Sequence, residues 1–120
     1  MEELKIGVIG SRGFNDYKLL KDTLDQYKGK VWLIVSGGAR GADSLGEKWA
    51  NENNVKTLIH RPNWDVHGKA AGFIRNELIV DDSDLIIAFW DGLSRGSEHS
   101  INLAKKKGKE VKIIYFNKVF

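Results

Sequence analysis

The sequence predicts an α/β fold in which helices flank a five-stranded, mainly parallel sheet. Five short runs rich in Ile, Val and Leu alternate with segments of helical periodicity, and this alternation is typical of parallel sheets covered on both faces. Most of the runs are continuously apolar, as expected for strands buried on both sides. Since the 120 residues contain no linker or internal repeat, we expect a single domain over residues 1–120.

The expected elements follow one another in the order βαβαβαβαβ. The strands are expected at residues 4–9, 31–35, 55–59, 85–89 and 111–115. The helices are expected from Asn15 or Asp16, over 41–53, over 69–80, and from Ser97 to a stop at Gly108. The side chains expected to face the sheet are Tyr17, Leu20, Leu24 and Tyr27; Ala42, Leu45, Trp49 and Ala50; Ala70, Ile74 and Leu78; and Ile101 and Ala104.

Composition excludes several classes of protein. Because the chain has no cysteine, it contains no disulfide framework and no thiolate metal site, and we expect a cytoplasmic protein. No apolar stretch approaches the ~20 residues of a membrane span, and the first residues do not resemble a signal peptide. The net charge is +3. The lysines at 105, 106, 107 and 109 are better explained by the negative end of a helix dipole than by a polyanion partner.

Two glycine-rich loops are expected at the carboxyl edge of the sheet, where open parallel sheets bind ligands. Residues 10–14 are Gly-Ser-Arg-Gly-Phe, and residues 36–43 are Ser-Gly-Gly-Ala-Arg-Gly-Ala-Asp. Glycines let backbone N–H groups approach an anion, and the following helix points its positive end there. Ordinary tight turns are the alternative, but two such loops favour phosphate binding. The candidate ligand-binding residues here are Gly10, Ser11, Arg12, Ser36, Gly37, Gly38, Arg40, Gly41 and Asp43.

The third loop, residues 60–67, is polar, aromatic and longer than a minimal connection, and such loops are often functional. Trp64 is a candidate either for stacking on a base or for packing as a lid on the core. His60 and His67 lack the spacing of a metal site, so we expect no metal and no cofactor. Arg75 and Asn76 follow on a mostly apolar helical segment and are candidates for an inward, anion-facing role.

The fourth loop combines a turn with a second helix N-terminus. Gly96 and Ser97 open the last helix, which offers another anion site with a hydroxyl cap. Asp91 precedes a glycine, so it is a candidate for a ribose contact, a general base or a plain turn. The ligand-binding candidates of this loop are Asp91, Gly92, Ser94, Arg95, Gly96 and Ser97.

Taken together, these four motifs resemble the YspA-like family of the SLOG superfamily over nearly the whole chain. The resemblance implies a bacterial or phage protein with a Rossmann-like three-layer sandwich and strand order 3-2-1-4-5. It also implies nucleotide binding and a homodimer or other homo-oligomer, because members often pair through helices beside the site. The superfamily contains phosphoribohydrolases and a domain that binds single-stranded DNA.

One position departs from the hydrolase branch. That branch places a catalytic Glu where this chain has Ser100. Glu98 lies two residues away, about 200° around a helix. We therefore expect binding or sensing of a nucleotide-derived, phosphate-bearing ligand with little or no turnover. The alternatives are an N-glycosidic hydrolase using Asp91 or Glu98, and a single-stranded DNA-binding domain.

Overall fold

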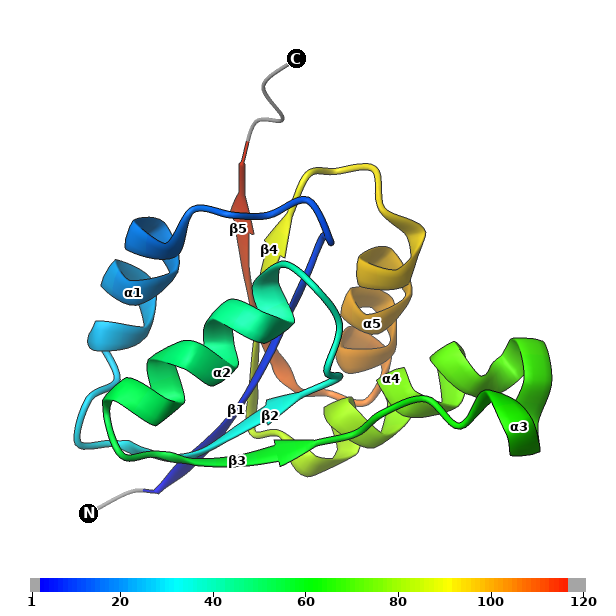
Figure 1. The fold of residues 1–120 in the computed structure, drawn as a ribbon, viewed down its shortest axis with the longest axis horizontal. Coiled ribbons are helices and arrows are strands. Elements are labelled where there is room, and N and C mark those ends of the chain that lie inside the picture. Colours follow the sequence, from blue (N-terminus) through cyan, green and yellow to red (C-terminus); the bar gives the residue numbers. More distant parts are fainter. Residues whose placement is uncertain (1–2, 117–120) are drawn as a thin grey trace.

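The computed structural model describes residues 3–116, and a five-stranded parallel sheet runs through the middle of this part of the chain (Figure 1). Its order is β3-β2-β1-β4-β5, and every neighbouring pair is parallel. The predicted strand order and the central place of the first strand are therefore confirmed. The strands are β1 (Leu4–Gly10), β2 (Val31–Ser36), β3 (Lys56–Ile59), β4 (Leu85–Trp90) and β5 (Glu110–Tyr115).

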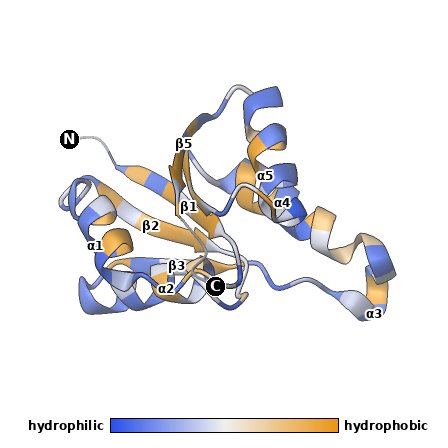
Figure 2. Cartoon of the chain, turned by 90° about the horizontal axis from the view of Figure 1, so that it is seen from above, coloured by the Kyte–Doolittle hydropathy of each residue, from blue (hydrophilic) through white to orange (hydrophobic). Residues whose placement is uncertain are grey.

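Helices cover both faces of the sheet (Figures 1 and 2). Helices α1 and α2 pack on one face, and α4 and α5 pack on the other. The central strand serves both layers, since Ile6 and Val8 belong to the core under α1 and α2 while Ile9 belongs to the core under α4 and α5. The helices are α1 (Tyr17–Asp25), α2 (Ala42–Glu52), α3 (Trp64–His67), α4 (Ala71–Asp82) and α5 (Arg95–Lys106), with a 3-10 turn η1 (Gly68–Ala70).

The predicted inward faces of α1, α2 and α5 are confirmed. In α1, for example, Leu20 and Leu24 are fully buried, and the Asp16 side chain caps the helix by accepting from the Leu19 N–H at 3.0 Å. Helix α5 starts at Arg95, two residues before the predicted Ser97, and its N-cap is Ser94.

The predicted inward face of the third helix is wrong at Ala70 and Leu78, while Ile74 is half-buried. Residues 64–70 form α3 and η1, so α4 begins at Ala71 and not at residue 69. Ala70 and Leu78 are exposed, and Ile79 and Val80 are buried. Apolar residues occur on several sides of this segment, and its contact with the sheet selects the face that is buried.

The segment formed by α3 and η1 projects from the body of the molecule (Figures 1 and 2). Trp64 is 54% exposed on it, so the interpretation of Trp64 as a lid on the core is wrong. Within residues 3–116, no helix has the length and apolar character needed to cross a membrane.

Candidate functional site

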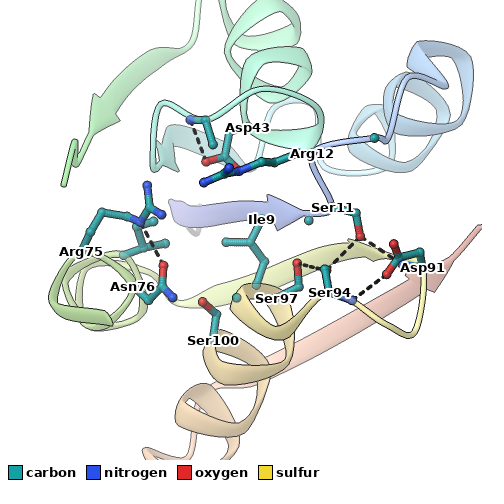
Figure 3. Close-up of a pocket in the computed structure, with 15 residues that line it drawn as sticks. Ile9, Ser11, Arg12, Asp43, Arg75, Asn76, Asp91, Ser94, Ser97 and Ser100 are labelled. Atoms are coloured by element: carbon teal, nitrogen blue, oxygen red, sulfur yellow. Dashed lines mark hydrogen bonds between the residues drawn. The ribbon is translucent and has the colours of Figure 1, made fainter. Parts of the chain in front are cut away.

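A cavity of about 340 Å³ opens at the carboxyl edge of the sheet, next to the end of β1 (Figure 3). The loop after β1, the start of α2, helix α4 and the start of α5 surround it. The residues that line it are Ile9, Gly10, Ser11, Arg12, Gly13, Ala39, Asp43, Arg75, Asn76, Ile79, Asp91, Ser94, Gly96, Ser97 and Ser100.

Two glycines bring the loop after β1 close to its neighbours. A Cβ on Gly10 would collide with the backbone oxygen of Phe89 in β4, and the Ser11 N–H donates to that same oxygen at 3.0 Å. Gly41 adopts φ +81°, and a side chain there would collide with the carbonyl oxygen of Ser11. The loop after β1 is therefore held between the β2–α2 loop and β4, with Arg12 at the cavity.

Serine hydroxyls join the first loop to the fourth. The Ser11 and Ser94 hydroxyls lie 3.0 Å apart, and Ser94 donates to the Ser97 hydroxyl at 3.0 Å (Figure 3). The Asp91 N–H donates to the Ser11 hydroxyl at 3.2 Å. One carboxylate oxygen of Asp91 accepts from the N–H groups of Leu93 at 2.8 Å and Ser94 at 2.9 Å. Asp91 therefore builds the turn that precedes α5.

The N-terminus of α5 faces the cavity without a side-chain cap. The Ser94 side chain makes no capping hydrogen bond, because its hydroxyl is bonded to Ser11 and Ser97. A Cβ on Gly96 would meet no atom within 4 Å. Ser100, only 2% exposed, presents its hydroxyl to the same cavity (Figure 3). The first turn of α5 thus offers N–H groups and the positive end of a helix dipole to a ligand.

The β2–α2 loop uses its N–H groups within the chain. One carboxylate oxygen of Asp43 accepts from the N–H groups of Gly37 at 3.1 Å and Ala39 at 3.2 Å. The Gly38 N–H donates to the Ser36 hydroxyl at 3.2 Å, and that hydroxyl donates to Glu47 at 2.6 Å. This glycine-rich loop is closed around Asp43, so these amides are not free to cradle a phosphate.

Burial raises the pKa of Asp43 to about 6, against the opposing effect of its N–H donors and of the Arg75 charge. Arg75 donates to the Gly37 carbonyl at 2.9 Å and to the Asn76 side-chain oxygen at 2.9 Å. Burial lowers the pKa of Arg75 and the Asp43 charge opposes that shift, but the guanidinium remains a cation at neutral pH. The Asn76 amide in turn lies 3.3 Å from Nδ1 of His99.

Comparison with known proteins identifies the family. The sequence model of the YspA, cpYpsA-related SLOG family matches residues 4–67. The gene 61 protein of Mycobacterium phage D29 is 35% identical over 113 residues, which cover 87% of this chain and 90% of the phage protein. The chain belongs to this SLOG family. Its resemblance to that family, expected from the loop motifs, is confirmed.

Solved structures share the fold of this SLOG domain. DNA processing protein A of Streptococcus pneumoniae matches with a TM-score of 0.78 and 22% identity, over 97% of this chain and 52% of that protein. DNA processing protein A of Helicobacter pylori, which binds single-stranded DNA, matches with a TM-score of 0.66 and 26% identity, over 92% of this chain and 64% of that protein. The protein TM1055 matches with a TM-score of 0.64 and 19% identity, over 92% of this chain and 72% of that one. The SLOG domain thus spans about half of the pneumococcal protein.

The SLOG cavity gathers many of the predicted site residues. Those that line it are Gly10, Ser11, Arg12, Asp43, Arg75, Asn76, Asp91, Ser94, Gly96 and Ser97. The predicted residues that do not line it are Ser36, Gly37, Gly38, Arg40, Gly41, Trp64, Gly92 and Arg95. Glu98 is exposed and also lies outside the lining.

Five lining residues of the SLOG domain were absent from the predicted site. Ile9 and Ile79 were missed because apolar residues in these segments are expected in the core. Their side chains do belong to the apolar layer under the cavity. Ser100 had a usable signal, since the resemblance to the superfamily places it where the hydrolase branch has its carboxylate. The others are Gly13 and Ala39. The two histidines of the third loop do not join a metal cluster within residues 3–116, and His60 contacts Asp82 at 2.6 Å.

Proposed function

We propose that this domain binds or senses a nucleotide-derived, phosphate-bearing small ligand in the cavity, with little or no turnover. The observation that carries the proposal is the first turn of α5, which faces the cavity without a side-chain cap. Arg12 and Arg75 line the same cavity. N–H groups at a helix N-terminus together with guanidinium groups form a favourable environment for a phosphate.

The size and polarity of the cavity support a small ligand. Its volume of about 340 Å³ falls within the range of about 300–1,000 Å³ that is usual for small-molecule sites. Ser11, Ser94, Ser97 and Ser100 supply hydroxyl groups along one side. Such groups bond both phosphate oxygens and ribose hydroxyls, because a hydroxyl donates and accepts.

The positions expected to supply a catalytic carboxylate support a low rate of glycosidic cleavage. Ser100 is neutral where the hydrolase branch has Glu. Glu98 is exposed and does not line the cavity. The Asp91 carboxylate accepts from two backbone N–H groups of its turn, which ties it to a structural position. Positioned acid–base help is typically worth about 10²–10⁴-fold in rate.

Calorimetry with a panel of nucleotides and ADP-ribose tests binding. We expect Arg12→Ala and Arg75→Ala each to lower the affinity for the tightest-binding ligand at least tenfold, about 1.4 kcal/mol. Arg61→Ala is the matched control, because Arg61 is exposed and lies outside the lining. Tight binding that survives both cavity substitutions would place the ligand elsewhere.

Incubation with AMP, cytokinin-type monophosphates and NAD, followed by chromatography for free base, tests turnover. We expect no base release above the uncatalysed rate. Rapid release that Asp91→Asn or Glu98→Gln abolishes would favour the hydrolase alternative.

A second candidate function is binding of single-stranded DNA. Its support is the likeness to the Helicobacter pylori protein and the exposure of Arg40, Arg61 and Arg95 after the carboxyl ends of three strands. Fluorescence anisotropy with a thymidine oligomer would then show binding that weakens steeply with salt. Replacing these three arginines by alanine would weaken DNA binding and leave the binding of a small ligand in the cavity unchanged.

The homodimer and the cytoplasmic location stay predictions.

A further inference from the structure

An exposed aromatic pair lies beside the cavity, where α4 packs against α5. Phe73 of α4 is 56% exposed, and its ring lies against the imidazole of His99 on α5, with the two ring centroids 4.6 Å apart. Nδ1 of His99 lies 3.3 Å from the side-chain amide nitrogen of Asn76, which lines the cavity. The pair therefore adjoins the cavity without belonging to its lining.

The hydrogen bonds of Asn76 determine which nitrogen of His99 carries a hydrogen. Nε of Arg75 donates to the side-chain oxygen of Asn76 at 2.9 Å (Figure 3), and an arginine can only donate. The amide nitrogen of Asn76 therefore faces His99. Because that nitrogen is also only a donor, Nδ1 of His99 is the acceptor. In this arrangement the imidazole carries its hydrogen on Nε2.

The Nε2–H group of His99 is open to a ligand. It has no hydrogen-bond partner within residues 3–116, and in this part of the chain no buried side-chain nitrogen or oxygen lacks a partner. Solvent therefore reaches Nε2, next to the exposed ring of Phe73. A group that suits both features is flat and aromatic and has a hydrogen-bond acceptor on its edge, as nucleobases do.

The aromatic pair is close to the place proposed for the phosphate. The proposed phosphate site is the first turn of α5, which carries Gly96 and Ser97. His99 follows Gly96 by three positions, and residues three apart are neighbours on the surface of a helix. Since a sugar separates the phosphate from the base in a nucleotide, a phosphate at Gly96 and a base at His99 leave the sugar in the cavity between them.

We propose that the ligand keeps its nucleobase, and that this base stacks on Phe73 and accepts a hydrogen bond from Nε2 of His99. This inference rests on the proposed function and names the ligand as an intact nucleotide rather than a sugar phosphate without a base. The cavity holds the phosphate and the sugar, and the aromatic pair selects for the presence of the base. Stacking of this kind tolerates different bases, because every base has a π face.

Two ligands, AMP and the corresponding methyl riboside phosphate, test the proposal. They share the phosphate and the closed sugar, and a methoxy group replaces the base in the second. Each is titrated into the full chain while the backbone amide signals of Gly96 and Ser97 are followed by NMR. We expect AMP to bind about tenfold more tightly. The adenine ring protons should move upfield, because they would lie over the ring of Phe73.

Phe73→Leu is the decisive variant, because it keeps an apolar side chain and removes the aromatic ring. We expect the affinity for AMP to fall about fivefold or more and the affinity for the methyl riboside phosphate to change less than about twofold. Phe73→Trp should restore the affinity for AMP. Leu78→Ala is the matched control, since it removes another exposed apolar side chain of α4 outside the lining, and both affinities should stay unchanged.

Long-range proton–nitrogen NMR spectra of the imidazole test the part assigned to His99. We expect a hydrogen on Nε2 in the free protein, and a shift of the Nε2 signal with AMP that the methyl riboside phosphate does not produce. A hydrogen on Nδ1, or equal shifts with both ligands, would overturn the hydrogen bond from His99 to the base.

The outcomes separate this inference from the proposed function. If the two ligands bind equally tightly, or if Phe73→Leu weakens both alike, the base site is overturned while phosphate binding stands. If neither ligand shifts the amide signals of the α5 first turn, both the base site and the proposed phosphate site are overturned.

Discussion

The loop before α2 and the loop before α5 look alike in sequence. They differ in which of their backbone N–H groups are bonded to side chains of the chain itself. Both follow a buried strand, both carry glycine and arginine, and they lead into helices of 11 and 12 residues. Before α2, Asp43 accepts from the N–H groups of Gly37 and Ala39. Before α5, the Ser94 hydroxyl turns to Ser11 and Ser97, and makes no cap.

The difference teaches that a glycine-rich loop at a helix N-terminus is an anion site only while the chain itself supplies no anion. Asp43 acts as an internal carboxylate ligand for the loop before α2 and lines the cavity. Before α5, Asp91 accepts from the N–H groups of Leu93 and Ser94, which precede the first turn, and no side chain caps the turn that carries Gly96 and Ser97. The same motif therefore builds a wall of the cavity in one place and a binding surface in the other.

Placing a carboxylate at the start of α5 should convert the second loop into a copy of the first. Gly96→Asp has room for a side chain, and a carboxylate near a helix N-terminus is stabilising by about 0.3–1 kcal/mol. We expect ligand affinity measured by calorimetry to fall at least 100-fold, about 2.7 kcal/mol, with no loss of thermal stability. Gly96→Asn controls for size, and an equal loss in that variant would mean that steric blocking explains the effect.

Removing the internal carboxylate should change how stability depends on pH. The folded pKa of Asp43 is raised to about 6, so the folded protein binds more protons than the unfolded chain between about pH 4 and 6. The stability contributed by the protonated carboxyl is fully present below about pH 4 and is lost as the pH rises through about 6.

Asp43→Asn lacks this titration. Relative to the unmodified protein, we expect its free energy of unfolding to rise by about 2 kcal/mol between pH 4 and pH 7. Urea unfolding of both proteins at several pH values measures the difference. A constant difference across this range would show that Asp43 titrates normally.

Cutting the link between the first and fourth loops should cost a moderate amount of stability. Ser11→Ala removes the hydroxyl that meets Ser94 and accepts from the Asp91 N–H. We expect the free energy of unfolding to fall by about 1–2 kcal/mol. Ser44→Ala is the comparison, because the hydroxyl of Ser44 makes an exposed bond to the Ala39 carbonyl and should cost less than about 0.5 kcal/mol. Equal losses of stability in the two variants would show that the hydrogen bonds of Ser11 contribute no more than the exposed bond of Ser44.

The smallest effect is expected at Arg40, the arginine of the closed loop. It is exposed and does not line the cavity, so Arg40→Ala should change ligand affinity by less than twofold. Calorimetry beside Arg75→Ala measures this. A tenfold loss of affinity in Arg40→Ala would show that the ligand extends over the β2–α2 loop. Both loops would then contact the ligand.

The residue pattern of the sequence was sufficient to predict the strands, most of the buried helix faces and the edge of the sheet at which the site lies. Runs such as 85–89 are apolar throughout, so they had to be buried on both faces, and parallel strands bring their following loops to one edge. The face of α4 was not predictable in this way, because its apolar residues suit more than one orientation. Only packing against the sheet buries Ile79 and Val80 and leaves Leu78 exposed.

The sequence by itself determined the α/β class and the loops that carry polar groups to the carboxyl edge of the sheet, because periodicity and glycine spacing are local properties. Tertiary structure alone decided which of those loops keeps its N–H groups free. The Asp43 carboxylate bonds the N–H groups of Gly37 and Ala39 in the loop before α2, whereas the Ser94 hydroxyl bonds other serines and makes no cap. The hydroxyl of Ser94 is drawn away by Ser11, 83 positions distant in the chain, and no local pattern contains that contact.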